Sequence, residues 1–422
     1  PASRAMAALA KGVAADLTGD HHVALTAQQQ AHDLYKELGD RKGLARVTGT
    51  LGILHNNIGD LPRALEYHQR ALLLFEEVED QAGIANSHNN TGIVYMLSGN
   101  FPQAAEHVQK AQSLFRSLGH HDGQARALNN LGIIHLEIDE SEKALDALTQ
   151  ALTLHPEDAV HLGVANVLAN TGIAHMRLGN FTTALEYFER SLAQYTALGN
   201  EATMTTVTCR IAETLLEMGD GDRAHALLKG ITVIDDDPPS VRIKVLMSRA
   251  ALAEHQGDLD ATQNILHDIL AISEQASLRS ISAETHEHLR ALAQQRNDFP
   301  AYIHHNTEFL RITEEIRGKE TNQKMAMMEA ERRIDGERRQ RERERAILYS
   351  TLPDHIADRL VRGEDVSGDH IADAAILFLD IVGFTTHAAQ LEPKAVTSLL
   401  DNIFQAFEEI CTRYNIIKVK TI

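Results

Sequence analysis

Small and apolar residues recur along the first part of the chain with a period of forty residues. The stretches "TLGILHNNIGDLPRALEYHQRAL" (50–72) and "NTGIVYMLSGNFPQAAEHVQKAQ" (90–112) align without a gap, and two further copies follow at 130–152 and 170–192. This period is typical of stacked repeats that each contain one supersecondary unit. Four series of small residues share the register: Gly12, Gly52, Gly92, Gly132, Gly172 and Ala212; Gly19, Gly59, Gly99, Asp139, Gly179 and Gly219; Ala24, Ala64, Ala104, Ala144, Ala184 and Ala224; Ala31, Ala71, Ala111, Ala151 and Ser191.

Each unit is predicted to be a helical hairpin. A small residue in the first helix lets the second helix approach closely, and a Gly followed by Asp or Asn ends the first helix in a tight turn. Ala positions seven residues apart leave a flat helix face on which the next hairpin packs. A further series is expected to fall in the connections between units: Gly43, Gly83, Gly123 and Gly163.

A charged segment follows the repeats at 319–345. It holds nine basic and seven acidic residues, no Pro and one Gly, so it is predicted to be a long, solvated helix. Its apolar seam is thin, with Met325, Met328 and Ile334 at near-heptad spacing. Two interpretations stay open: a weak coiled coil and a rigid solvated spacer.

The pattern changes after residue 346. The run "AAILFLDIVGF" (374–384) predicts a buried strand that leads into Asp380 and then Gly383. Residues 392–414 predict an amphipathic helix, and "YNIIKVKTI" (414–422) predicts a second strand because it is rich in β-branched residues. Strand, helix and strand in this order indicate part of an α/β or α+β unit.

Charge and composition narrow the class of protein. Forty basic and 59 acidic residues give a net charge of −19, which argues against a general nucleic-acid binder and for a well-solvated, cytoplasmic protein. No apolar run approaches the roughly 18 residues that a membrane span requires, so no membrane span is expected. Cys209 and Cys411 lack metal-site or redox spacing and are interpreted as packing residues in a reducing compartment.

Two groups of side chains suggest chemistry. A carboxylate at the end of a buried strand, as at Asp380, can hold a hard cation, and the backbone N–H groups of the turn at Gly383 can hold phosphate. Histidine recurs at one repeat position, where His55, His135 and His175 align with Tyr95. Neighbouring repeats lie about 10 Å apart, too far to share one ion, so these side chains are interpreted as packing residues.

The forty-residue pattern resembles the tetratricopeptide repeat, in the longer form found in kinesin light chains, over about residues 1–300. The resemblance implies an α-solenoid of helical hairpins with a concave groove that binds a peptide or protein ligand. Asn90, Asn130 and Asn170 match positions that face this groove in the family. An Asn ladder there can hydrogen-bond the backbone of a ligand, or it can simply cap or solvate that face.

Residues 347–422 resemble the opening of a class III nucleotidyl cyclase catalytic domain. The resemblance rests on "LPDHIADRL", "ILFLDIVGFTT", "LLDNIFQAFEEI" and "IIKVKTI", in this order and spacing. It implies a ferredoxin-like α+β fold, a site between two domains of a homodimer, and two Mg²⁺ or Mn²⁺ ions that assist the attack of the ribose 3′-hydroxyl.

Individual residues carry over from this resemblance. Asp380 matches the first metal-binding Asp, and Ile381 matches the position that binds metal through its carbonyl. Gly383, Phe384 and Thr385 match the turn that contacts the triphosphate. Lys420 matches the base-selecting position, where Lys marks adenylate and Glu marks guanylate cyclases, so ATP is the expected substrate. A lysine also suits adenine N1 because it donates hydrogen bonds and accepts none.

The two resemblances together predict an adenylate cyclase, a phosphorus–oxygen lyase, regulated by tetratricopeptide repeats. The predicted parts are a repeat array (1–313), a charged signalling helix (314–346), a transducing segment (347–370) and an incomplete cyclase domain (371–422). Because the family's remaining active-site residues would follow residue 422, this chain alone is expected to be inactive. Two alternatives stay open: a non-enzymatic repeat scaffold with a cyclase remnant, and a guanylate cyclase.

Overall fold

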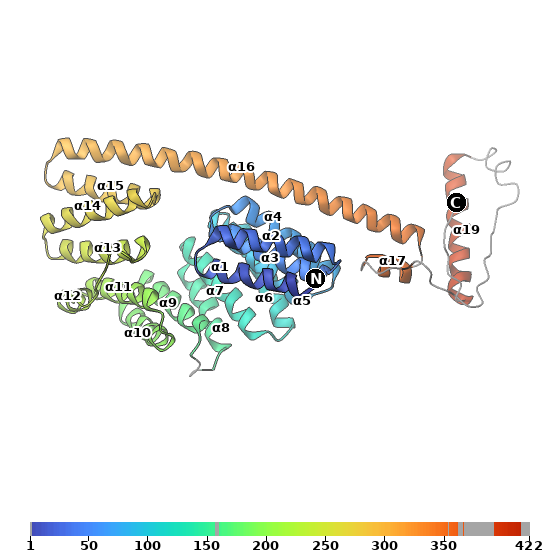
Figure 1. Ribbon diagram of the computed structural model, residues 1–422, viewed down its shortest axis with the longest axis horizontal. Coiled ribbons are helices and arrows are strands. Elements are labelled where there is room, and N and C mark those ends of the chain that lie inside the picture. Colours follow the sequence, from blue (N-terminus) through green and yellow to red (C-terminus); the bar gives the residue numbers. More distant parts are fainter. Residues whose placement is uncertain (1, 157–159, 353, 362–365, 367–391, 415–422) are drawn as a thin grey trace. The chain divides into compact units, whose positions relative to one another are not determined.

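The computed structural model describes residues 2–156, 160–352, 354–361, 366 and 392–414 (Figure 1). The chain divides into two compact units, Pro1–Arg332 and Arg333–Ile422. The first unit contains antiparallel helical hairpins that pack one after another along the chain (Figure 1). Its helices are α1 Ala2–Leu17, α2 His21–Glu37, α3 Arg41–Asn57, α4 Leu61–Glu77, α5 Gln81–Leu97, α6 Phe101–Ser117, α7 His121–Glu137, α8 Ser141–Thr153, α9 Leu162–Arg177, α10 Phe181–Leu198, α11 Glu201–Glu217, α12 Gly221–Lys229, α13 Pro239–His255, α14 Leu259–Gln275 and α15 Arg279–Gln295.

The turns within and between hairpins have a common construction. A residue with positive φ ends one helix in most turns, and in many of them the next residue caps the following helix with its side chain, although Asn100, Glu140 and Asn180 make no such cap. Gly59 has φ +79°, for example, and the Asp60 carboxylate accepts a hydrogen bond from the backbone N–H of Arg63. Non-glycine residues also adopt this conformation, as at Asp139 with φ +58°. The turns predicted from the Gly-Asp and Gly-Asn pairs are therefore confirmed, and their geometry stops each helix after about four turns.

The small-residue series explain how the hairpins close. A Cβ atom added at Gly52 would lie 2.6 Å from the His68 ring, and one at Gly172 would lie 2.7 Å from the Phe188 ring. Each glycine thus admits a large side chain from the second helix of its own hairpin. The two Ala series, which begin at Ala24 and at Ala31 and include Ser191, are fully buried between neighbouring helices. These positions lie in the interior of the array, between its successive helices.

The series at Gly43, Gly83, Gly123 and Gly163 lies elsewhere than expected. These glycines stand in the first turn of α3, α5, α7 and α9, not in the connections between units. An aromatic side chain from the preceding helix covers Gly43, Gly83 and Gly123: a Cβ at Gly83 would lie 2.2 Å from the Phe75 ring. Gly163 instead faces the ring of its own N-cap residue, His161. The expected location was wrong because these glycines serve close packing between repeats rather than a turn.

Gly92→Ala tests this packing. The added Cβ would meet the Val108 side chain at 2.4 Å and the backbone of α6 at 3.1 Å, and backbone atoms cannot move aside cheaply. We expect a loss of about 1–3 kcal/mol in the free energy of unfolding. Gly49→Ala is the control, because its Cβ would meet only Ala71 at 3.8 Å; helix propensity predicts a gain of up to about 1 kcal/mol. Thermal unfolding followed by circular dichroism measures both, and equal midpoints for the two variants would contradict the expectation.

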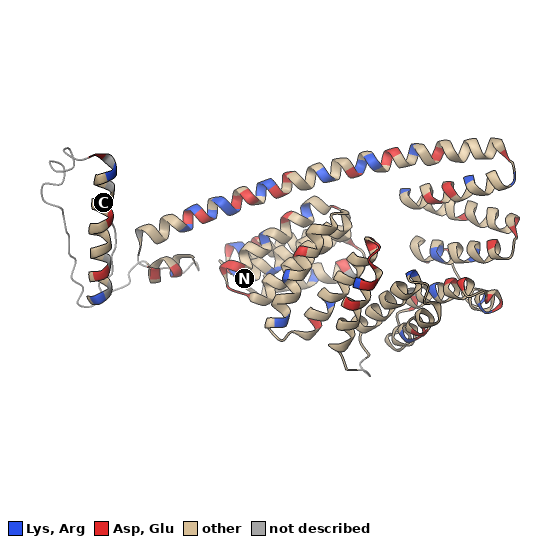
Figure 2. Ribbon diagram, turned by 180° about the vertical axis from the view of Figure 1, so that it is seen from behind, with Lys and Arg blue, Asp and Glu red and all other residues tan. Residues whose placement is uncertain are grey.

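The last helix of the array continues into the charged segment. Helix α16 runs without a break from Phe299 to Thr351, so the predicted boundaries after residues 313 and 346 both fall inside it. Lys, Arg, Asp and Glu alternate along its second half (Figure 2). The predicted seam residues Met325 and Met328 are exposed, at 57% and 54%, whereas Met327, Ala330 and Ile334 are buried. Ile334, the third predicted seam residue, belongs to this buried stripe, so the predicted seam was wrong at Met325 and Met328.

The second unit contains two further helices, α17 Asp354–Val361 and α19 Pro393–Tyr414. The amphipathic helix predicted at 392–414 is confirmed by α19, in which Val396, Leu400 and Phe404 are partly buried. The residues that the structure describes are helical and contain no strand. The mainly helical fold class is thus confirmed, while the two strands predicted for the α+β domain lie outside the described residues.

Candidate functional site

A cavity of about 770 Å³ lies between α2, α3 and α4. Apolar side chains of Leu25, Leu34 and Leu51 form part of its wall, and both charges and amides reach into it. It is open to solvent and large enough for several peptide side chains. Its remaining lining residues are Thr26, Gln29, Gln30, Asp33, Glu37, His55, Arg63 and Tyr67.

Two ring side chains that line this cavity stack on each other. The imidazole of His55 stacks on the Tyr67 ring with centroids 5.1 Å apart. Burial lowers the pKa of His55, opposed by Asp60, so the ring is neutral at pH 7. Arg63, which lines the cavity together with Asp33 and Glu37, is exposed and forms an ion pair with Asp60 at 3.5 Å. The histidine at this repeat position thus packs against an aromatic ring of the next helix. His175 stacks on Tyr187 in the same way.

The predicted Asn ladder connects neighbouring repeats. The Asn130 amide donates to the Asn89 Oδ1 at 3.0 Å, and the Asn170 amide donates to the Asn129 Oδ1 at 2.9 Å. Asn130 is only 8% exposed, whereas Asn90 is half-buried. One N–H of each donor is therefore engaged within the array, so these amides align the first helices of successive repeats. Their role toward a bound peptide stays a prediction.

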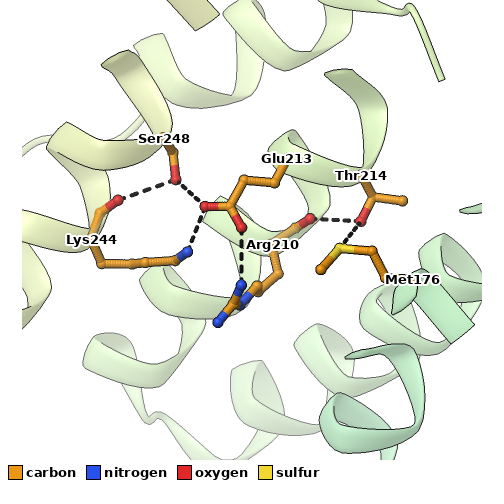
Figure 3. Close-up of polar contacts among 6 residues, drawn as sticks. All are labelled: Met176, Arg210, Glu213, Thr214, Lys244 and Ser248. Atoms are coloured by element: carbon orange, nitrogen blue, oxygen red, sulfur yellow. Dashed lines mark hydrogen bonds and ion pairs between the residues drawn. The ribbon is translucent and has the colours of Figure 1, made fainter. Parts of the chain in front are cut away.

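The same register position holds an ion network where the repeats become irregular. Arg210 follows Asn170 by forty residues, and its guanidinium donates to the Glu213 Oε2 at 3.2 Å (Figure 3). The other oxygen of Glu213 accepts from Lys244 and from the Ser248 hydroxyl, the latter at 2.8 Å. The network joins α11 to α13 across the short helix α12. Sequence reasoning missed it, although a Glu in place of Ile173 at the same repeat position was a visible signal.

A second cavity, of about 350 Å³, lies between the α5–α6 turn and helix α16. The Tyr95 hydroxyl donates to the Glu331 Oε1 at 2.7 Å across one side of it. Met327 is 5% exposed and packs in the same hydrophobic cluster as Tyr95. Burial, and secondarily Lys110, lower the pKa of the adjacent His107 to about 4, so that ring is neutral at pH 7. The array thus holds a segment of α16 on its surface.

Histidines also gather where α16 begins. The Nδ1 atoms of His286 and His305 lie 3.0 Å apart, and the rings of His267 and His304 are close by. Burial lowers the pKa of His305 to about 4, which keeps this pair neutral. Within the described ranges, no three His, Cys, Asp or Glu side chains are arranged to hold a metal ion. The four rings contact one another where α14, α15 and α16 meet.

The residues predicted to carry cyclase chemistry lie outside the described residues. These are Asp380, Ile381, Gly383, Phe384, Thr385 and Lys420. Among the helices that the structure describes, none has the length and hydropathy needed to cross a bilayer.

Two protein families match this chain. Residues 3–77 and 83–157 match the tetratricopeptide repeat. Residues 366–422 match the adenylate and guanylate cyclase catalytic domain. The two matches fall on the parts of the chain where the sequence pattern predicted them.

Curated relatives resemble the C-terminal part. The chain is 39% identical over 77 residues to atrial natriuretic peptide receptor 2 of Homo sapiens, covering 18% of this chain and 7% of the receptor. It is 40% identical over 76 residues to the guanylate cyclase soluble subunit alpha-2 of Homo sapiens, covering 18% of this chain and 10% of that subunit. The chain therefore spans a small fraction of the length of these relatives.

Solved structures resemble the repeat array. The apo form of the quorum sensor NprR from B. thuringiensis has a TM-score of 0.60 and 14% identity, covering 73% of this chain and 87% of that one. A signal-transduction ATPase with a tetratricopeptide repeat sensor from Pyrococcus horikoshii has a TM-score of 0.52 and 15% identity, covering 67% of this chain and 44% of that one. At these identities the likeness concerns the fold.

Proposed function

We propose that this chain, which combines tetratricopeptide repeats with a segment of an adenylate and guanylate cyclase catalytic domain, belongs to a nucleotidyl cyclase controlled through its repeats. The observation that carries the proposal is the presence of both elements on one chain, joined by the continuous helix α16. A helix that links the repeat array to the cyclase segment could transmit regulation, because a ligand that changes the conformation of the array also moves the helix.

The proposed reaction converts a nucleoside triphosphate to its 3′,5′-cyclic monophosphate and pyrophosphate. The ribose 3′-oxygen loses its proton and bonds to the α-phosphorus, and the bond from that phosphorus to the leaving pyrophosphate breaks. The carboxylate of Asp380 and the carbonyl of Ile381 are hard oxygen ligands, which fit Mg²⁺ or Mn²⁺. Bound divalent ions would lower the pKa of the 3′-hydroxyl and stabilise the charge of pyrophosphate. Gly383, Phe384 and Thr385 would contact the triphosphate.

ATP is the substrate that we propose. Lys420 supports it, because an ammonium group can donate to the unprotonated N1 of adenine but cannot accept from the N1–H of guanine. GTP is the second candidate, favoured by the guanylate cyclase names of matched relatives. A homodimer is part of the proposal, because in the cyclase family the site forms between two catalytic domains.

The test is an assay of the full-length protein with ATP and with GTP in the presence of Mg²⁺ or Mn²⁺. We expect cyclic AMP and pyrophosphate in equal amounts, and cyclic GMP from GTP at a rate at least about tenfold lower. Removing residues 1–310 should change the basal rate or its response to a partner. A full-length protein that forms neither cyclic nucleotide would refute catalysis and favour the scaffold. An unchanged rate and response after the deletion would refute regulation by the repeats.

A further inference from the structure

Tyr95 interrupts a pattern that the other repeats keep. His55, His135 and His175 stand at the same position of the first helix, and His55 and His175 each stack on a Tyr of the second helix. In α5 and α6 the two residue types are exchanged, so that the Tyr95 ring lies against His107 with centroids 5.5 Å apart. The exchange puts a phenol hydroxyl where other repeats carry an imidazole, and this hydroxyl reaches Glu331 in α16.

The contact with α16 has both a polar and an apolar part. The Tyr95 side chain is 3% exposed and donates to the Glu331 carboxylate, a charge-assisted hydrogen bond. One turn before Glu331, Met327 enters the hydrophobic cluster of the array, which also holds Phe115 and Leu131. Neighbouring Met325 is 57% exposed, so only one face of α16 is docked.

The docking is incomplete. A cavity of about 350 Å³ separates Asn100 and Gln103 from Lys324 and Met328. At about 30 Å³ per molecule, it has room for on the order of ten waters. The cavity is open to solvent, and Met328 in its wall is 54% exposed, so the contact ends at a solvated rim and resembles a separable interface more than a closed core.

The buried face is also the face that α16 would use to pair with a second helix. Met327, Ala330 and Ile334 are spaced by three and four residues, the a and d spacing of a coiled coil, and all three are buried. The next positions of the same seam are Glu337 and Arg341, which are charged. Met327, which packs in the hydrophobic cluster of the array, therefore cannot pack against a partner helix at the same time.

We infer that residues 324–331 of α16 form a latch on the repeat array, seated at Tyr95, and that the docked latch keeps the helix from pairing in an active cyclase dimer. The regulatory consequence rests on the proposed function, whereas the docking rests on the contacts of Tyr95, Met327 and Glu331 alone. The open cavity of α2–α4 lies at the equivalent repeat positions, since His55 and Arg63 precede Tyr95 and Gln103 by forty residues. In the repeat that contains Tyr95, the surface equivalent to this open cavity is thus covered by helix α16 of the same chain.

Met327→Asp tests the latch in the full-length protein, with Met325→Asp as the matched control on the exposed face. A buried, unpaired carboxylate disfavours docking, so hydrogen exchange of residues 320–332 should rise at least about tenfold. Basal cyclic-nucleotide formation should rise at least about threefold, and the control should change neither. Tyr95→Phe removes one hydroxyl and disturbs folding less than Met327→Asp. It should also raise both the hydrogen exchange of residues 320–332 and cyclic-nucleotide formation, whereas Tyr187→Phe should raise neither.

Equal exchange in Met327→Asp and Met325→Asp would overturn the docking. Faster exchange without a change in cyclic-nucleotide formation would overturn the control of the cyclase by the latch. If neither the unaltered protein nor any variant formed a cyclic nucleotide, the proposed function would fail instead, and exchange would still decide the docking.

Discussion

Asp380→Ala is expected to lower cyclic-nucleotide formation by the full-length protein by about a hundredfold or more. Asp380 matches the first metal-binding carboxylate of the cyclase family, and it is the one carboxylate in 371–390 that directly follows the apolar run 374–379. Without it, the divalent ions lose a charged ligand, and the developing charge on the 3′-oxygen and on pyrophosphate is stabilised less.

The measurement is the initial rate at saturating ATP over a range of Mg²⁺ and Mn²⁺ concentrations. If Asp380 binds metal, a higher metal concentration should restore part of the rate of Asp380→Ala. If Asp380 has only a structural role, the metal concentration should not restore the rate. Glu409→Ala is the control, because Glu409 is an exposed carboxylate on α19 in the same part of the chain. Activity within threefold of the unaltered protein after Asp380→Ala would exclude Asp380 as a metal ligand.

Lys420→Glu is expected to reverse the substrate preference, changing the ratio of kcat/KM for ATP to that for GTP by at least about a hundredfold. In the proposed site the ammonium group of Lys420 would donate to adenine, whereas a glutamate would accept from the N1–H and N2 of guanine. The reversal therefore combines a lost contact with ATP and a gained contact with GTP.

Competition between ATP and GTP in one reaction measures this ratio directly. Lys418→Glu makes the same change of charge two residues earlier, and it should leave the ratio within about threefold. If the unaltered protein already prefers GTP, Lys420 does not select the base and the second candidate substrate is correct. A fall in both rates without a change in their ratio would assign Lys420 a structural role.

The sequence determined the repeat array almost completely, because the relevant interactions are local and recur. The Gly-Asp turns, the close approach at Gly52 and the flat Ala faces each involve residues within one forty-residue unit or its neighbour. The same signal repeated in several units could be recognised even where single positions vary, as at Asp139. The charged helix was also predictable, since its length and the absence of Pro are properties of the segment alone.

The sequence also indicated the class of chemistry, since the cyclase motifs are short and contiguous. It did not separate the roles of residues that serve both packing and binding. Asn130 and Asn170 form a ladder between repeats, which their spacing allowed but did not specify, because each amide can donate either to a ligand or to a neighbouring helix.

Only the tertiary structure decided what covers α16. Tyr95 and Glu331 are 236 residues apart, and no periodicity in the sequence relates them. Which face of a nearly uniformly polar helix is buried depends on the surface that it meets, so Met327 rather than Met325 or Met328 lies in the core. The local pattern therefore determined the hairpins and the motifs, whereas the latch depends on a long-range contact that forms only when the repeats have stacked.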